Sequence, residues 1–165
     1  QELVVMPGGI VYKKILIPTD GSPLATAAAY AAIELARQLA AETVGIFVAP
    51  EYQYPVYVEM IPPDFPSEEE YKASMCKAGE AYLEEIRRAA AKAGLKFSGV
   101  TVFSEATAQP IVATAEEQHC DLIFMGSHGR SGWRQLLLGS VTSKVLAICQ
   151  IPVLVYRSKR EPSHA

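Results

Sequence analysis

Glycine and hydroxyl residues gather in one segment of the chain, and their types and spacing suit the binding of a phosphate group. The segment contains Gly126, Gly129 and Gly132 and continues to Gly139 and Ser140. Glycines let a ligand approach the main chain closely, and backbone N–H groups in such a turn can surround an anion. If a helix begins near Ser140, its first N–H groups and its positive dipole end add to this attraction. Without a ligand, the same glycines would simply form a turn between a strand and a helix.

Side chains of this segment add donors for an anion. The hydroxyls of Ser140 and Thr142 can donate hydrogen bonds to phosphate oxygens, and the guanidinium of Arg130 can donate charge-assisted ones. Because the net charge of the chain is −3, attraction for a phosphate has to come from such local groups rather than from the overall charge.

Asp20 belongs to a second polar segment, residues 18–22, which directly follows the apolar run Ile15–Ile17. A carboxylate at the end of a strand can accept hydrogen bonds from a ribose hydroxyl or an adenine amino group, as acidic residues do in dinucleotide-binding folds. A carboxylate in this position can also cap the helix that follows. The sequence leaves both roles open.

A hydrolase triad is a further alternative, because His128 lies beside Ser127 and Ser131 and a carboxylate is available at Asp20. No G-x-S-x-G nucleophile elbow accompanies these residues. The chain also contains neither a G-x-x-x-x-G-K-[ST] phosphate loop nor a G-x-G-x-x-G fingerprint. The better known nucleotide-binding and hydrolase motifs are therefore missing.

The elements that position these segments alternate between strands and helices. Short continuous apolar runs are typical of buried parallel strands, and the Ala- and Leu-rich stretch after Pro23 places Leu24, Ala28, Ala32, Leu35 and Leu39 on one helical face. We predict strands at 12–18, 43–48, 97–103, 121–125 and 152–157, and helices at 24–40, 67–92, 108–119 and 140–149. Such alternation predicts an α/β fold, a single doubly wound domain with a five-stranded parallel sheet and helices on both faces.

The strand order decides whether the two polar segments meet. In an order 3-2-1-4-5, strands one and four both end at the crevice where the order reverses, and ligands bind there in doubly wound sheets. Residues 50–70 form a proline-rich insertion with several tyrosines, among them Tyr52, Tyr54 and Tyr57. This insertion either covers a site or an interface, or packs on its own aromatic side chains.

Composition narrows the classes of function. The slightly acidic chain offers no broadly basic surface for nucleic acid, and no apolar run reaches the ~18 residues of a membrane span. The three cysteines form no C-x-x-C pair, which is typical of reduced thiols in a cytoplasmic protein. We expect one domain over residues 12–157, with flexible tails at 1–11 and 158–165.

The glycine spacing also carries a family resemblance. Gly126-x2-Gly129-x9-Gly139-Ser140 matches the G-x2-G-x9-G-[ST] pattern of the ATP-binding universal stress proteins. The flanking sequences KKILIPTDGS, MGSHGRSG, LLLGSVTSKVL and PVLVYR resemble the same family, so the similarity extends from Tyr12 to Arg157. Two positions depart from the common pattern: Phe47 stands where many relatives have histidine, and Glu105-Ala106-Thr107 stands in place of a Gly-x-Pro.

The resemblance implies ATP, or ADP or AMP, held between strands one and four of a sheet in the order 3-2-1-4-5. It implies Mg²⁺ or Mn²⁺ bound mainly through the phosphates and water, and a homodimer formed through the last strand, Pro152–Arg157. The residues implied in nucleotide binding are Pro18, Thr19, Asp20, Val48, Gly126, Ser127, His128, Gly129, Arg130, Ser131, Gly132, Gly139, Ser140, Val141 and Thr142.

The resulting hypothesis is an ATP-binding stress-response protein that passes its nucleotide occupancy to a regulatory protein partner. Hydrolysis should be slow at most, because the sequence shows no clear general base and no separate charged finger of the kind used in fast phosphoryl transfer. Two alternatives stay open. One is a genuine ATPase or nucleotidyl-transfer enzyme, and the other is a nucleotide-free dimeric interaction module.

Overall fold

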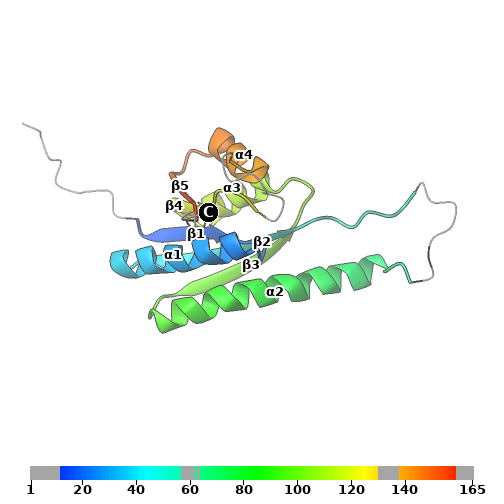
Figure 1. The fold of residues 1–165 in the computed structure, drawn as a ribbon, viewed down its shortest axis with the longest axis horizontal. Helices are drawn as coiled ribbons and strands as arrows, with labels where there is room; N and C mark the ends of the chain where they lie inside the picture. Colours follow the sequence, from blue (N-terminus) through cyan, green and yellow to red (C-terminus); the bar gives the residue numbers. More distant parts are fainter. Residues whose placement is uncertain (1–11, 57–61, 63, 130–137, 159–165) are drawn as a thin grey trace, which may run out of the picture.

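Strands and helices alternate along the whole domain, as the sequence predicts. The computed structural model describes residues 12–56, 62, 64–129 and 138–158 (Figure 1). Its elements are β1 (Lys14–Pro18), α1 (Pro23–Leu39), β2 (Glu42–Ala49), α2 (Glu68–Lys92), β3 (Phe97–Phe103), α3 (Ala108–Glu117), β4 (Leu122–Gly126), α4 (Ser140–Ile148) and β5 (Val153–Tyr156). Each predicted element is present, and the ends differ from the prediction by a few residues at most.

The sheet has five strands in the order β3-β2-β1-β4-β5, and every neighbouring pair is parallel. The predicted fold class and strand order are therefore confirmed. β1 lies in the centre, with Leu16 opposite Val44 of β2 and Ile123 of β4. The order reverses at β1 and β4, so the polar segments that follow these two strands emerge at the same edge of the sheet.

Two helices cover each face of the sheet. Figure 1 shows α1 and α2 on one side and α3 and α4 on the other. Successive residues of β1 point to opposite faces: Ile15 and Ile17 join the core beneath α1 and α2, whereas Leu16 joins the core beneath α3 and α4. All three side chains are fully buried, which explains why this strand reads as a continuous apolar run.

The first helix begins with a serine cap. Ser22 accepts a hydrogen bond from the Ala25 N–H at 3.2 Å, and Pro23 follows in the first turn of the helix, where proline is well tolerated. Ser22 therefore fills the capping role that the sequence also allowed for Asp20.

The buried face of α1 differs in part from the predicted stripe. Ala28 and Ala32 are buried as expected, but Leu24, Leu35 and Leu39 are only half-buried. The rest of the buried face consists of Ala25, Ala29, Ile33 and Ala36. Small alanine side chains let the helix lie close to the sheet, and the larger leucines then flank the contact.

The long helix α2 begins and ends as its sequence predicts. Ser67 and Glu70 form a capping box, with the Glu70 N–H donating to Ser67 Oγ at 3.2 Å and the Ser67 N–H donating to Glu70 Oε2 at 2.8 Å. Gly94, at φ +72°, follows the helix in the left-handed conformation that favours glycine. Although α2 has 25 residues, neither it nor any other helix of the described residues is apolar enough to span a membrane.

The proline-rich insertion packs on its own aromatic side chains where the structure describes it. The Tyr52 ring lies 6.3 Å from the Phe65 ring and 5.6 Å from the Tyr71 ring. The Tyr52 hydroxyl donates to the Pro66 carbonyl, and the Tyr71 hydroxyl donates to the Pro50 carbonyl, both at 2.9 Å. These contacts tie the chain after β2 to the first turn of α2. Tyr57 lies outside the described residues.

The cysteines differ in how easily a reagent can reach them, and burial also affects the ionisation of Cys120. Cys120 is buried, and its burial raises the thiol pKa to about 11, because a low-dielectric surrounding disfavours the thiolate. Cys76 is exposed on α2. We expect iodoacetamide at pH 8 to alkylate Cys76 in the native protein and Cys120 only after unfolding, since the thiolate is the reactive form. Peptide mass spectrometry after short exposures measures this, and rapid native alkylation of Cys120 would contradict it.

Candidate functional site

A cavity of about 200 Å³ opens at the carboxyl ends of β1 and β4. Six of the elements described above (β1, α1, β2, α3, β4 and α4) contribute to its wall, together with the loops that follow β1, β3 and β4. Its lining consists of Pro18, Thr19, Asp20, Ala25, Ile46, Val48, Thr107, Ile111, Met125, Gly126, His128, Gly129, Val141 and Thr142. The cavity therefore lies at the reversal point of the strand order, where doubly wound folds bind ligands.

One part of the cavity wall is apolar. Ile46 and Val48 come from β2, Met125 from β4, Ile111 from α3 and Val141 from α4. The polar groups of the lining lie mainly on the loops after β1 and β4. An apolar wall with a few convergent polar groups is the usual composition of a small-molecule site, and it suits a flat ring that carries a polar substituent.

Hydrogen bonds within the loop fix the conformation of the segment after β1. The Thr19 N–H donates to the Ile46 carbonyl at 2.9 Å, which continues the sheet pairing past β1. The Gly21 N–H donates to Thr19 Oγ1 at 3.1 Å, and the Ser22 N–H donates to Asp20 Oδ1 at 2.9 Å. Short polar side chains commonly order turns in this way. The loop thus holds one carboxylate oxygen of Asp20 in a defined place.

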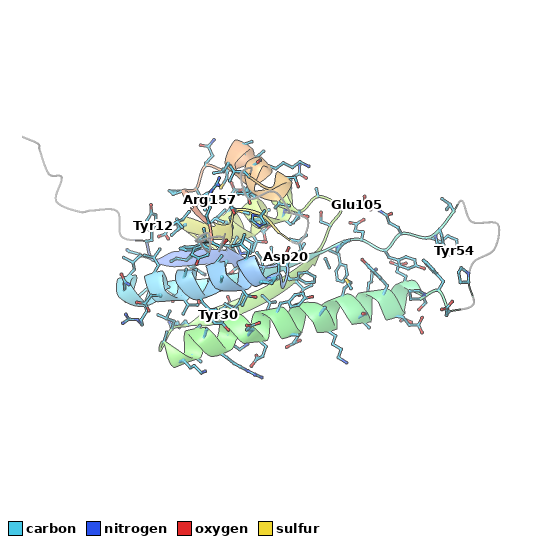
Figure 2. All side chains as sticks on the ribbon, viewed as in Figure 1. Tyr12, Asp20, Tyr30, Tyr54, Glu105 and Arg157 are labelled. Atoms are coloured by element: carbon cyan, nitrogen blue, oxygen red, sulfur yellow. The ribbon has the colours of Figure 1, made fainter. Side chains whose placement is uncertain are left out.

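The second carboxylate oxygen of Asp20 lies against Gly129, in the segment after β4. A Cβ atom on Gly129 would lie only 2.5 Å from Asp20 Oδ2. The two polar segments that the sequence singles out are therefore in direct contact, as the expected strand order requires. Only glycine allows the main chain to approach the carboxylate this closely without a shift of either group. Figure 2 shows Asp20 at the N-terminal end of α1.

Backbone contacts bring the start of α4 back beside the end of β4. The Ser127 N–H donates to the Tyr156 carbonyl at 2.8 Å, and the Gly139 N–H donates to the Ser127 carbonyl at 2.7 Å. A Cβ on Gly139 would lie 2.9 Å from the His128 Cα, so glycine is needed at this crossing point as well. The glycine at the start of α4 therefore lets the chain pass close to the end of β4, in addition to any role with a ligand.

The N-terminus of α4 opens toward this region without a side-chain cap. Gly139 is the capping residue and has no side chain to donate or accept, so the first N–H groups of α4 form a positive helix end. Thr142 is 2% exposed, and its hydroxyl donates to the Gly126 carbonyl at 2.9 Å. In this structure its hydroxyl hydrogen thus holds α4 against β4, whereas the sequence suggested it as a phosphate donor.

The structure brings together most, but not all, of the residues implied by the resemblance. Those that line the cavity are Pro18, Thr19, Asp20, Val48, Gly126, His128, Gly129, Val141 and Thr142. Ser127 is buried below the loop, and Gly139 stands behind His128. Ser140 is exposed and lines a neighbouring groove with Glu105 and Lys144. Arg130, Ser131 and Gly132 lie outside the described residues.

Sequence reasoning missed five residues of the lining: Ala25, Ile46, Thr107, Ile111 and Met125. The sequence could have indicated Ile46, because it lies two positions before the predicted site residue Val48 and therefore on the same face of the strand. Met125 directly precedes Gly126 at the end of β4. Thr107 and Ile111 lie at the beginning of α3, and only the packing of α3 beside α4 brings them to the cavity.

Of the two serines in the hydrolase alternative, Ser131 lies outside the described residues, and the geometry of Ser127 gives that alternative little support. Ser127 Oγ lies 3.1 Å from His128 Nδ1, a contact between neighbouring residues. Ser127 is only 4% exposed and does not line the cavity, so its hydroxyl is poorly placed to attack a bound substrate. The arrangement orients the His128 ring rather than presenting a nucleophile.

A larger hollow of about 870 Å³ lies between α1 and α2, away from the glycine segments. Its charged side chains form pairs on its walls: Arg37 contacts Glu34 at 2.7 Å and Arg88 contacts Glu84 at 3.1 Å. Exposed pairs of this kind contribute little to stability and leave few groups for a ligand. The cavity at β1 and β4 is therefore the better candidate site.

Comparison with known proteins shows which family this chain resembles. The model of the universal stress protein family matches residues 11–157. The universal stress protein MJ0531 of Methanocaldococcus jannaschii is 31% identical over 96% of this chain and 89% of its own length. The solved structure of MJ0577 from the same organism is 31% identical, with a TM-score of 0.76 over 92% of this chain and all of that chain.

More distant structures share the fold and carry nucleotides. A universal stress protein in complex with cAMP is 22% identical, with a TM-score of 0.65 over 91% of this chain and all of that chain. A universal stress protein from Archaeoglobus fulgidus in complex with dAMP is 20% identical, with a TM-score of 0.55 over 88% of this chain and 98% of its own. With the family model matching nearly the whole described domain, this chain belongs to the universal stress protein family.

Proposed function

We propose that this protein binds an adenine nucleotide, ATP or else ADP or AMP, in the cavity at the ends of β1 and β4. The protein would act as a stress-response regulator, whose interactions with a protein partner depend on the nucleotide that it holds. The observation that supports this most strongly is the contact of Asp20 with Gly129, which joins a carboxylate and a glycine segment at one cavity. Distant family members in complex with cAMP and dAMP agree with this class of ligand.

The residues present fit the adenosine part of such a ligand. The apolar side chains of Ile46, Val48 and Met125 offer surface for the adenine ring. Asp20 is the residue whose carboxylate can accept hydrogen bonds from ribose hydroxyls. We therefore place the base against β2 and β4, and the ribose beside Asp20.

The phosphates would extend from the ribose along Gly129 toward the start of α4. The uncapped N-terminus of α4, at Gly139 and Ser140, supplies N–H donors and a positive helix end. The groove next to the cavity shares Thr107 and Val141 with it and includes Ser140 and Lys144. A ligand that leaves the cavity in this direction meets the ammonium group of Lys144 and the hydroxyl groups of Thr107 and Ser140.

A divalent cation, Mg²⁺ or Mn²⁺, would be carried mainly by the phosphates and water. Within the described part of the chain, no three His, Cys, Asp or Glu side chains gather closely enough to hold a metal ion. We expect hydrolysis to be slow at most, because the sequence shows no clear general base and no separate charged finger of the kind used in fast phosphoryl transfer.

The direct test is to ask whether nucleotide accompanies the purified protein. Denaturation followed by mass spectrometry of the released small molecules should detect ATP or ADP. Mg-ATP added at about 100 times its Kd should stabilise the fold by about 2.7 kcal/mol, which raises the melting temperature by roughly 5–10 °C. No released nucleotide together with no thermal shift would contradict the proposal and favour a nucleotide-free interaction module.

Ser140→Ala tests the direction of the phosphates. Because Ser140 is exposed at the first turn of α4, the change should leave the fold intact. We expect ATP binding to weaken by about 1 kcal/mol, the usual contribution of one hydrogen bond, and AMP binding to stay within twofold. Isothermal titration calorimetry with both nucleotides measures this. An equal loss for ATP and AMP would place the longer phosphate chain elsewhere.

We also propose a homodimer formed through the last strand. β5 lies at the edge of the sheet, and Leu154 is 37% exposed there, with Leu146 and Ile148 exposed on α4. An edge strand with apolar side chains readily pairs with a second copy. Leu154→Lys should convert the dimer to a monomer in light scattering. A wild-type protein that is already monomeric would contradict this proposal but not the nucleotide site.

The remaining parts of the hypothesis are a cytoplasmic location and a regulatory protein partner that senses the bound nucleotide. Neither nucleic acid nor a membrane is part of it.

A further inference from the structure

The outer side of the Asp20 loop is covered by a tyrosine of α2. Tyr82 lies half-buried near the middle of α2. A Cβ on Gly21 would run into three atoms of the Tyr82 ring, so the ring rests directly on the backbone of the residue that follows Asp20. Gly21 has φ +74°, a conformation that side chains rarely adopt. Glycine is therefore required at this position both by the backbone and by the ring.

The Tyr82 ring is itself held from the sheet. It meets Phe47 of β2 edge to face, with ring centroids 5.4 Å apart and an angle of 83° between the planes, a favourable geometry for aromatic pairs. Phe47 is 7% exposed. One turn earlier in α2, a Cβ on Gly79 would lie 2.6 Å from Phe47 Cδ1. The position of the Tyr82 ring is thus set by close packing between α2 and the sheet.

The other long-range contacts of this loop lie at the residues before Gly21, where the Thr19 N–H donates to the Ile46 carbonyl and Asp20 Oδ2 lies against Gly129. The hydrogen bonds from the Gly21 and Ser22 N–H groups go to Thr19 and Asp20, which belong to the same loop. Such local bonds give the turn its shape but do not set its place relative to the sheet. At Gly21 itself, the nearest atoms from a distant element belong to the Tyr82 ring.

We propose that Tyr82 is a positioning residue of the nucleotide site: its ring holds the Gly21 turn and thereby keeps the Asp20 carboxylate beside Gly129. The inference rests on the proposed function, because its value to the protein lies in presenting Asp20 to a ribose. Phe47 then also acts on the site without touching the ligand, because it holds the Tyr82 ring that in turn holds the loop. The ring, rather than the hydroxyl, carries the contact with Gly21.

Three variants test this inference: Tyr82→Ala, Tyr82→Phe and Leu83→Ala. Tyr82→Ala should weaken ATP binding by about tenfold in calorimetry, the loss expected when one charge-assisted hydrogen bond is misaligned. Tyr82→Phe keeps the ring and should stay within about twofold of the wild type. A Tyr82→Phe loss as large as that of Tyr82→Ala would overturn the role of the ring.

Leu83→Ala is the matched control for a general loosening of α2. Leu83 is 5% exposed and packs against the positions of Gly45 and Gly99, away from the Asp20 loop. Its truncation should lower the stability in urea at least as much as Tyr82→Ala does, because it leaves a cavity in the core. ATP affinity should nevertheless stay within about twofold. An equal loss of affinity in both variants would show that Tyr82 acts only through stability and would overturn the inference.

Hydrogen exchange in the ligand-free protein separates this inference from the proposed function. In Tyr82→Ala, the amides of Gly21 and Ser22 should exchange about tenfold faster, because the turn that orders them has lost its support. In Leu83→Ala they should keep their wild-type rates relative to the rest of β1 and α1. If the wild type fails to bind ATP, the proposed function fails, and the exchange rates still decide whether Tyr82 orders the loop. Unchanged rates in Tyr82→Ala would overturn the inference even if ATP binds.

Discussion

Gly129→Glu should abolish ATP binding while the protein stays folded. The new side chain would begin 2.5 Å from Asp20 Oδ2 and fill the opening of a cavity of about 200 Å³. It would also place a second negative charge beside Asp20 and beside the phosphates of a bound nucleotide, and like charges at such distances repel strongly. We expect an affinity loss of at least ~100-fold in calorimetry. Because Gly129 is exposed and outside the left-handed region of φ, and the atom that its Cβ would meet is the end of the Asp20 side chain, Asp20 can turn aside and the protein should stay folded with a moderate loss of stability.

Two controls separate bulk from charge in this experiment. Gly129→Gln adds nearly the same volume without the charge, and it should weaken ATP binding less than Gly129→Glu does. Gln118→Glu adds the same charge at the exposed C-terminal end of α3, opposite the end at which Thr107 and Ile111 line the cavity, and it should leave the affinity within about twofold. Wild-type affinity in Gly129→Glu would show that the nucleotide binds somewhere other than the cavity described above.

Gly79→Leu should destabilise the fold by about 2 kcal/mol or more, although leucine favours helices by about 1 kcal/mol over glycine. Gly79 is buried in α2, and its Cβ alone would lie 2.6 Å from Phe47 Cδ1 and 2.6 Å from Thr101 Oγ1. A leucine therefore has to push α2 away from β2 and β3, and overpacking of this kind commonly costs 1–3 kcal/mol. For a domain of this size, the melting temperature should fall by roughly 4–8 °C.

Lys77→Leu is the control for this change, since Lys77 lies exposed on the same helix. It introduces the same side chain without a contact to the sheet, and its melting temperature should stay within about 2 °C of the wild type. If Gly79→Leu is as stable as Lys77→Leu, α2 does not lie as close to the sheet as the distances at Phe47 and Thr101 indicate.

The sequence predicted the order of elements and the edge of the sheet at which the candidate site lies. Buried parallel strands such as Ile15–Ile17 leave a local signal, because both faces must be apolar. The caps at Ser67 and Gly94 likewise depend on neighbouring residues. Features of this kind are readable because the residues that determine them are close together along the chain.

The parts that sequence reasoning missed depend on contacts between distant residues. Thr107 and Ile111 reach the cavity only because α3 packs beside α4, and no local pattern announces that packing. The residue type of Thr142 suits a phosphate donor, but its hydroxyl donates its hydrogen bond to the carbonyl of Gly126, 16 positions away. The role of Asp20, a ligand contact or the cap of α1, was also undecided, because its residue type suits both, and the structure gives the cap to Ser22.

The role of the proline-rich insertion could not be predicted from its sequence either. Its sequence allowed a cover over a site, an interface or a segment packed on itself. The described residues show packing of Tyr52 on Phe65 and Tyr71, and Figure 2 shows Tyr54 at the far end of this segment, away from Asp20. Aromatic residues serve all three purposes equally well, so only the path of the chain distinguishes them.

The central pairing of β1 with β4 has a consequence for synthesis on the ribosome. The amide of Lys14, at the start of β1, binds the carboxylate of Asp121, which lies 107 positions later at the start of β4. Until that later segment leaves the ribosome, one edge of β1 has no partner, and such edges favour misassociation of nascent chains. Six of the fourteen residues that line the cavity follow Asp121 in the sequence and arrive with the same late part of the chain. A nucleotide that binds there would therefore stabilise only finished molecules, and would favour completed chains over truncated ones in the cell.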